Sequence, residues 1–220
     1  MNPVLYLHGF ASGPSSRKAR FFREYLEAAG AQVEVLDLAR DDFEHLTLTG
    51  QLLVVEEAAA GRRVALIGSS MGGYLAALYA ARHPETACLV LLAPAFDFAR
   101  LWRERLGEQQ MEQWLGTGWI ETFHYALNRP CRLAYGLMED ARRYEPFPDF
   151  AQPTLIFHGA QDDVVPLELS ERCAAVHPNA QLEVLDSGHE MLNVLEAMGP
   201  RTLGFLERFN AAPQTPPLRP

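Results

Sequence analysis

The chain has 220 residues, of which 48% are hydrophobic and 21% charged, and its formal net charge is −9. This composition is typical of a globular domain with a sizeable core, and the negative charge argues against nucleic acid or an anionic membrane as a partner. The apolar runs are far shorter than the roughly 20 residues of a membrane-spanning helix. The N-terminus has no basic region and the three cysteines match no metal pattern, so we expect a reduced, cytoplasmic protein.

Short apolar runs rich in Val, Ile and Leu alternate with helical patterns along the chain. Such runs are typical of strands that are covered on both faces. They span residues 4–9, 32–38, 63–68, 87–93, 153–159 and 181–186, and the helical patterns span residues 15–30, 46–61, 74–84, 166–178 and 190–209. Strands alternating with helices predict an α/β fold with right-handed crossovers, here a mostly parallel six-stranded sheet with helices on both faces.

One interval breaks this alternation. About 60 residues separate the fourth predicted strand from the fifth, far more than a single crossover needs. Segment 97–150 contains all three tryptophans and two amphipathic runs, FARLWRERL and QQMEQWL. We expect a helical cap insertion within a single domain spanning residues 1–210, followed by a disordered tail at 211–220. The alternative is a pair of ordinary core helices joined by an irregular loop.

The sequence LIGSSMGGYLA places two serines between glycines where a predicted strand meets a predicted helix. It contains the pattern G-x-S-x-G, with Gly68, Ser70 and Gly72 at the fixed positions. A serine on so sharp a turn exposes its hydroxyl above the sheet, and only very small residues two places away let strand and helix approach closely enough. A Gly/Ser turn could match by chance, but the position between strand and helix favours Ser70 as a nucleophile.

A serine nucleophile needs a base, and the base needs an acid that orients it. In this architecture the acid and then the histidine follow the serine, at the ends of later strands. Asp162 and Asp163 in HGAQDDVVP and His189 in LDSGHEML lie at such positions. Each could instead be a turn or helix-start residue, but their order favours Asp162 as the acid, with Asp163 in the turn and His189 as the base. Asp97 is the reserve acid.

An oxyanion formed at Ser70 also needs hydrogen-bond donors. One candidate is the backbone N–H of Met71 at the start of the next helix, and the other is the N–H of Phe10 in the loop after the first strand. Gly9 lets that loop come close. We expect His8 to fix this loop and His158 to pack beneath the acid loop, so neither is expected to be the base.

The segments YLHGFASGPSSRKA, IGSSMGGYLA and LLAPA together resemble the small bacterial α/β-hydrolases of the YqiA type, a group of carboxylesterases. The segments HGAQDDVVP and SGHE resemble α/β-hydrolases more broadly. The resemblance covers the first ~95 residues well, and residues 153–190 in motif only. It implies an α/β-hydrolase fold and an esterase without a cofactor. The residues it implies are Ser70 as nucleophile, Asp162 as acid, His189 as base, and Phe10 and Met71 as oxyanion donors. The Trp-rich interval is longer than expected in that compact group.

The expected reaction is hydrolysis of a carboxylic ester with a small or apolar acyl group through an acyl-enzyme. In an open α/β sheet the site lies above the carboxyl ends of the strands, so Trp102 and Trp119 of the insertion are expected to line an acyl pocket. Thioesterase, lipase, acyltransferase and peptidase action use the same residues, and a non-catalytic binding protein of this fold is a further alternative. The expected partner is a small-molecule ester, with no nucleic acid, membrane, cofactor or metal.

Overall fold

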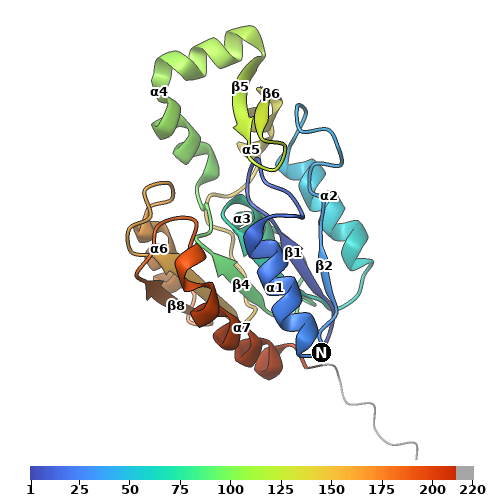
Figure 1. The fold of residues 1–220 in the computed structure, drawn as a ribbon. Helices are drawn as coiled ribbons and strands as arrows, with labels where there is room; N and C mark the ends of the chain where they lie inside the picture. Colours follow the sequence, from blue (N-terminus) through green and yellow to red (C-terminus); the bar gives the residue numbers. More distant parts are fainter. Residues whose placement is uncertain (212–220) are drawn as a thin grey trace, which may run out of the picture.

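The central feature of the fold is a six-stranded parallel sheet with strand order β2-β1-β3-β4-β7-β8 (Figure 1). The structure is a computed structural model and describes residues 1–211, so the tail predicted at 211–220 lies, from residue 212 on, outside the described residues. The strands are β1 (Val4–Leu7), β2 (Val33–Val35), β3 (Ala65–Ser69), β4 (Leu89–Leu92), β7 (Thr154–Gly159) and β8 (Ala180–Leu185). The predicted parallel sheet is therefore confirmed.

Helices cover both faces of this sheet, as predicted from the alternating pattern. They are α1 (Arg17–Ala28), α2 (Leu48–Ala59), α3 (Met71–Arg82), α4 (Phe98–Thr117), α5 (Gly136–Ala141), α6 (Leu167–Val176) and α7 (Leu195–Phe209). A short 3₁₀ helix (Leu192–Val194) precedes α7, and the last α-helix lies within the predicted range 190–209. Within the described residues, no helix has the length and apolar character needed to cross a membrane.

The two faces of the sheet have separate hydrophobic cores because side chains alternate along a strand. In β1, Val4 and Tyr6 face α1 and α7, whereas Leu5 and Leu7 face α2, α3 and α6. All four side chains are buried, which explains why this strand is an uninterrupted apolar run in the sequence. Because the helices cover the faces of the sheet, the loops at the carboxyl ends of the strands remain available to form a functional site.

Segment 97–150 departs from the predicted helical insertion. Its second half contains an antiparallel hairpin of β5 (Trp119–His124) and β6 (Arg129–Ala134), which the sequence analysis missed. The two amphipathic runs form a single assigned helix, α4, which bends at Gly107, where φ is 74° and ψ is 167°. In Figure 1 the second part of α4 and the hairpin lie above the sheet, beyond the carboxyl ends of β1 and β4.

Hydrogen bonds hold this segment to the rest of the domain. The backbone N–H of Tyr125, in the hairpin turn, donates to the carbonyl of Ala11 at 2.8 Å. At the other end of the segment, the buried carboxylate of Asp140 accepts from the backbone N–H of Thr49 at 2.7 Å and from its hydroxyl at 2.6 Å. The hairpin turn is therefore fixed next to the loop that follows β1.

Candidate active site

Ser70 lies on the sharp turn between β3 and α3, with a φ of 54° and a ψ of −118°. A non-glycine residue rarely adopts a positive φ, and such strain is concentrated at functional sites. A Cβ atom on Gly68 would overlap the backbone of Gly72, and a Cβ atom on Gly72 would overlap the carbonyl group of Leu7. The glycines of the G-x-S-x-G pattern are therefore required by the close approach of strand and helix, as the sequence predicts.

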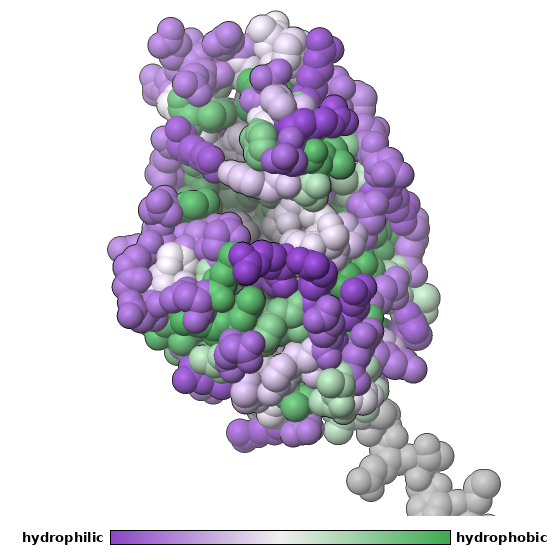
Figure 2. All heavy atoms as spheres, in the orientation of Figure 1, coloured by the Kyte–Doolittle hydropathy of each residue, from purple (hydrophilic) through white to green (hydrophobic). Residues whose placement is uncertain are grey.

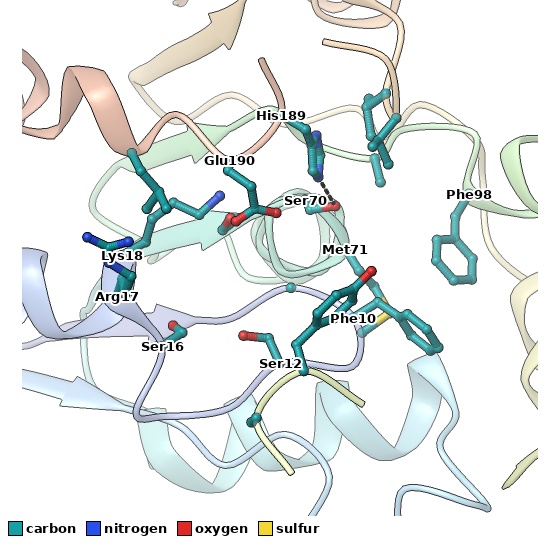
Figure 3. Close-up of a pocket in the computed structure, with 18 of the residues that line it drawn as sticks. Phe10, Ser12, Ser16, Arg17, Lys18, Ser70, Met71, Phe98, His189 and Glu190 are labelled. Atoms are coloured by element: carbon teal, nitrogen blue, oxygen red, sulfur yellow. Dashed lines mark hydrogen bonds between the residues drawn. The ribbon is translucent and has the colours of Figure 1, made fainter. Parts of the chain in front are cut away.

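Ser70, His189 and Asp162 form one chain of hydrogen bonds. The Ser70 hydroxyl lies 3.1 Å from Nε2 of His189 (Figure 3). On the other side of the ring, Nδ1–H of His189 donates to Oδ2 of Asp162 at 2.7 Å. Asp162 follows β7 and His189 follows β8, so three separate strand ends bring the residues together. The Asp162 side chain is fully buried and that of His189 is 12% exposed. This arrangement matches a nucleophile, a base and an orienting acid.

The surroundings of Asp162 stabilise its charged form. Its Oδ1 accepts from the backbone N–H groups of Val164 at 2.9 Å and Val165 at 2.8 Å. Burial alone would raise the pKa of this carboxyl. However, interactions with His158 and His189, together with the Val165 N–H, hold its pKa well below the usual range. Asp162 is therefore a carboxylate at neutral pH, as an orienting acid must be.

The other two acid candidates are placed differently. Asp163 is exposed and makes no hydrogen bond to His189 in the described part of the chain. Asp97 adopts a left-handed conformation at the start of α4, and its carboxylate accepts from Nε of Arg100 at 2.6 Å. Of the three aspartates, Asp162 alone carries the hydrogen bond to the imidazole.

The two backbone N–H groups expected to bind an oxyanion both border the same cavity as Ser70. Within residues 1–211, neither the N–H of Phe10 nor that of Met71 donates a hydrogen bond. Met71 is the first residue of α3, where the helix dipole adds positive potential. The buried His8 has its Nδ1 atom 2.9 Å from the carbonyl of Gly9, and burial lowers its pKa. His8 therefore occupies the structural position expected for it.

A cavity of about 840 Å³ opens in front of Ser70. In the space-filling view the surface is hollowed below segment 97–150, whose outer surface is largely polar (Figure 2). One part of the lining is apolar or aromatic and comes from the β1–α1 loop, the β4–α4 loop, α4, the hairpin turn and the β7–α6 loop: Phe10, Ala95, Phe98, Leu101, Trp102, Tyr125, Ala126, Val164 and Val165. Segment 97–150 thus contributes a wall of the cavity, as an insertion leaving the end of β4 should.

The structure brings only one of the two predicted substrate-binding tryptophans to this cavity. Trp102 borders the cavity and packs edge-on against Phe10, with ring centroids 5.1 Å apart. Trp119 is not among the lining residues; it lies at the start of β5, 39% exposed, with the Arg132 guanidinium over its ring. Trp114 is fully buried and donates from Nε1 to the carbonyl of Leu133 at 3.0 Å, which joins α4 to the hairpin.

Sequence reasoning missed a polar part of the cavity lining. Tyr6, Lys18 and Glu190 border the cavity, and none was a candidate. Tyr6 lies within an apolar strand and Lys18 at the start of a helix, where each has an ordinary structural explanation. Figure 3 shows Lys18 and Glu190 on one side of Ser70 and Phe98 on the opposite side. The one available signal was that Lys18 lies within the segment YLHGFASGPSSRKA, which carries the family resemblance.

The parallel sheet, the serine turn and the placement of the histidine and aspartate define a member of the α/β-hydrolase superfamily. The model of the uncharacterised protein family UPF0227 matches residues 3–206, and the chain belongs to this family. The match includes segment 97–150, which the resemblance to YqiA-type proteins did not cover. The predicted superfamily is thus confirmed.

Solved structures with the same fold are similar along nearly the whole chain. The mouse α/β-hydrolase domain-containing protein 10 has a TM-score of 0.79 and 18% identity, covering 94% of this chain and 90% of its own. Est1E from Butyrivibrio proteoclasticus with bound ferulic acid has a TM-score of 0.81 and 21% identity, covering 96% and 90%. The esterase Pf2001 of Pyrococcus furiosus has a TM-score of 0.65 and 20% identity, covering 96% and 84%. No curated protein sequence matches significantly.

Proposed function

We propose that this protein is a serine hydrolase that cleaves carboxylic esters through a covalent acyl-enzyme. The observation that carries the proposal is the hydrogen-bonded chain from Ser70 through His189 to the buried Asp162, at the edge of a cavity. A serine hydroxyl is a weak nucleophile unless a base accepts its proton, and this geometry supplies that base. The esterases among the structural neighbours share the fold and are consistent with the proposal.

In the first half of the reaction, Oγ of Ser70 attacks the ester carbonyl carbon while Nε2 of His189 takes the hydroxyl proton. The carbonyl oxygen becomes an oxyanion that accepts from the free N–H groups of Phe10 and Met71. The C–O bond to the alcohol then breaks, and His189 returns its proton to the leaving oxygen. Asp162 holds the imidazole in the required tautomer and stabilises its charged form.

In the second half, a water molecule replaces the alcohol. His189 accepts a proton from this water, whose oxygen attacks the acyl carbon, and the bond to Oγ of Ser70 breaks. The serine recovers its proton from His189, and the carboxylic acid leaves. Every proton transfer uses the same imidazole, and the chain's own residues provide all the groups that these steps require.

Segment 97–150 acts in this proposal as a cap that forms the acyl pocket. Phe98, Leu101 and Trp102 of α4 line the cavity, and Phe98 lies on the opposite side of Ser70 from Lys18 (Figure 3). Apolar walls favour the binding of apolar acyl groups. Trp119, although predicted to bind substrate, is left out of this pocket because of its position on β5.

A panel of nitrophenyl esters with increasing acyl length tests the proposal. The wild-type protein should hydrolyse several of them, and Ser70→Ala should lower kcat by on the order of 10⁴- to 10⁶-fold without unfolding the protein. Ser69→Ala is the matched control, because the neighbouring serine makes no hydrogen bond to His189 in the described residues and should retain most activity. Near-wild-type turnover by a folded Ser70→Ala variant would contradict the proposal.

A further inference from the structure

Within residues 1–211, the cavity contains a largely buried lysine that has no direct partner. Lys18, the second residue of α1, borders the cavity; burial lowers its pKa, and the charges of Glu190 and Asp162 raise it. In the described residues its ammonium group makes neither a hydrogen bond nor an ion pair. Figure 3 shows its side chain extending toward Glu190 and Ser70. Burying an unpaired charge is costly, so a partner from outside the chain would stabilise this arrangement.

A second unpartnered group lies beside the same cavity. Tyr6 is 1% exposed and borders the cavity, and its hydroxyl forms no hydrogen bond of normal geometry among the described residues, although the Ser69 side chain lies close enough to act on its pKa. Burial raises the pKa of Tyr6, so the phenol keeps its proton and can act as a donor. A buried phenol without a partner is unusual in a folded protein. Lys18 and Tyr6 thus present two free donors.

The first turn of α1 adds positive potential at this place. The backbone N–H groups of Arg17 and Lys18 donate no hydrogen bond within residues 1–211, while Ser16 caps the N–H of Ala19 at 3.4 Å. The first turn holds no acidic residue and has two basic ones, Arg17 and Lys18. Basic residues at a helix N-terminus interact unfavourably with the helix dipole, so Arg17 and Lys18 do not stabilise α1. Their positive charges, together with the free N–H groups, favour the binding of an anion at this helix end.

The charged residues that line the cavity are mostly positive, whereas the net charge of the protein is negative. The molecule has a net charge of −9, yet the charged lining residues are three cations, Arg17, Lys18 and Arg105, and one carboxylate, Glu190. Glu190 is exposed; its charge raises the pKa of Lys18, but the two side chains form no direct ion pair. An electropositive cavity in an acidic protein attracts anions selectively.

We propose that the substrate is an ester with a second, anionic group, such as a carboxylate, which binds between the Lys18 ammonium, the Tyr6 hydroxyl and the first turn of α1. This inference rests on the proposed ester hydrolysis and adds a substrate class to it. The anionic group occupies the polar side of the cavity, and the ester carbonyl lies at Ser70. The remaining apolar part of the substrate contacts the wall formed by Phe98 and Trp102.

Matched substrate pairs test this inference. On the acyl side, the pair is the mono-4-nitrophenyl ester of suberic acid and the same compound with its free carboxylate converted to a methyl ester. On the alcohol side, the pair is the butyrate ester of 4-hydroxybenzoate and that of methyl 4-hydroxybenzoate. The pair that responds shows whether the subsite accepts an anion on the acyl side or on the alcohol side of the ester. For that pair, Lys18→Met should lower kcat/KM on the charged member by on the order of 10- to 100-fold, mainly through KM. The neutral member should change by less than about 3-fold.

Two further variants separate the subsite from a general effect of charge. Tyr6→Phe removes the free hydroxyl but keeps the ring, and should lower kcat/KM on the same charged ester by on the order of 5-fold. Arg20→Met removes an exposed cation of α1 that does not line the cavity, and should leave the ratio between charged and neutral esters unchanged. An equal loss in Arg20→Met and Lys18→Met would overturn the inference.

A binding measurement tests the anion subsite even if the protein does not hydrolyse the esters. Titration calorimetry with 4-hydroxybenzoate and suberate should show binding of at least one carboxylate by wild type and by Ser70→Ala, and weaker binding by Lys18→Met. If the esters are not hydrolysed but carboxylate binding depends on Lys18, the proposed reaction fails and the subsite remains. If wild type and Lys18→Met show the same charged-to-neutral ratio in both pairs, or bind the carboxylates equally, the subsite is refuted.

Discussion

His158 and Asp162 are buried together, with Nε2 of His158 lying 3.3 Å from Oδ2 of Asp162 and neither side chain exposed to solvent. The same imidazole nitrogen donates to the carbonyl of Val165 at 2.9 Å, and the Ser170 hydroxyl lies 2.7 Å from Nδ1. His158, which lies on β7, therefore connects the loop that carries Asp162 to α6 through these contacts. The sequence analysis expected a packing role beneath this loop, and the contacts agree with that expectation.

The first prediction concerns this positioning residue. His158→Gln should lower the free energy of unfolding by about 1–3 kcal/mol, because buried partners lose their hydrogen bonds. It should also lower kcat by about 10-fold, because Asp162 is then less well held. Urea denaturation and nitrophenyl ester kinetics measure the two effects. The exposed His45→Gln variant is the control, and unchanged stability and kcat in His158→Gln would show that the contact has no such role.

The second prediction separates the paired aspartates. Asp162→Asn should lower kcat by on the order of 10⁴-fold, because an amide at this position does not maintain the tautomer of His189 that accepts the serine proton. Asp163→Asn should stay within a few-fold of wild type, since this exposed side chain does not contact the imidazole. Steady-state kinetics on one ester decide between them. A larger loss in Asp163→Asn would move the acid by one residue.

The third prediction uses the difference between two tryptophans of segment 97–150. Trp102→Ala removes an aromatic side chain from the apolar wall and so enlarges the cavity; the preferred acyl length should therefore increase while activity on acetate esters is largely kept. Trp119→Ala should leave the acyl preference unchanged, because Trp119 does not line the cavity. The measurement is kcat/KM across a series of nitrophenyl esters. An equal loss on all substrates in Trp102→Ala would indicate a core residue only.

The fourth prediction concerns the glycines around Ser70. Gly72→Ala should destabilise the protein by about 3 kcal/mol or more, because its methyl group would overlap the carbonyl groups of Leu7 and His8. Gly204→Ala, in the exposed part of α7 with open space around the added atom, should instead stabilise by about 0.5–1 kcal/mol. Urea denaturation compares the two variants. A stable Gly72→Ala variant would contradict the role assigned to the close approach of β1 and α3.

The parallel sheet and the three residues of the hydrogen-bonded chain could be predicted because local patterns determine them. Ser70 and Asp162 follow the buried strands β3 and β7, and His189 follows β8, an edge strand that is only partly buried. The hairpin of segment 97–150 could not be recognised in the same way. Most residues of β5 and β6 are exposed or partly buried, so neither strand is a continuous apolar run, and Pro130 inside β6 further weakens a strand prediction.

The polar side of the cavity could not be predicted for a different reason. Tyr6 and Lys18 have ordinary local explanations, as a strand residue and a residue in the first turn of a helix. Their unpartnered polar atoms become evident only when β1, α1 and the loop with Glu190 are packed around one cavity. The same applies to Trp119, whose position outside the cavity follows from a hairpin that the sequence pattern did not reveal.

The most direct test of the central claim is labelling with a fluorophosphonate, followed by intact-mass measurement and peptide mapping. The account predicts one adduct per chain, located on Ser70, because His189 activates this hydroxyl and the cavity admits the probe. His189→Ala should react far more slowly, and Ser70→Ala should not be labelled. A folded wild-type protein that stays unlabelled, or that carries its adduct on another residue, would contradict the account.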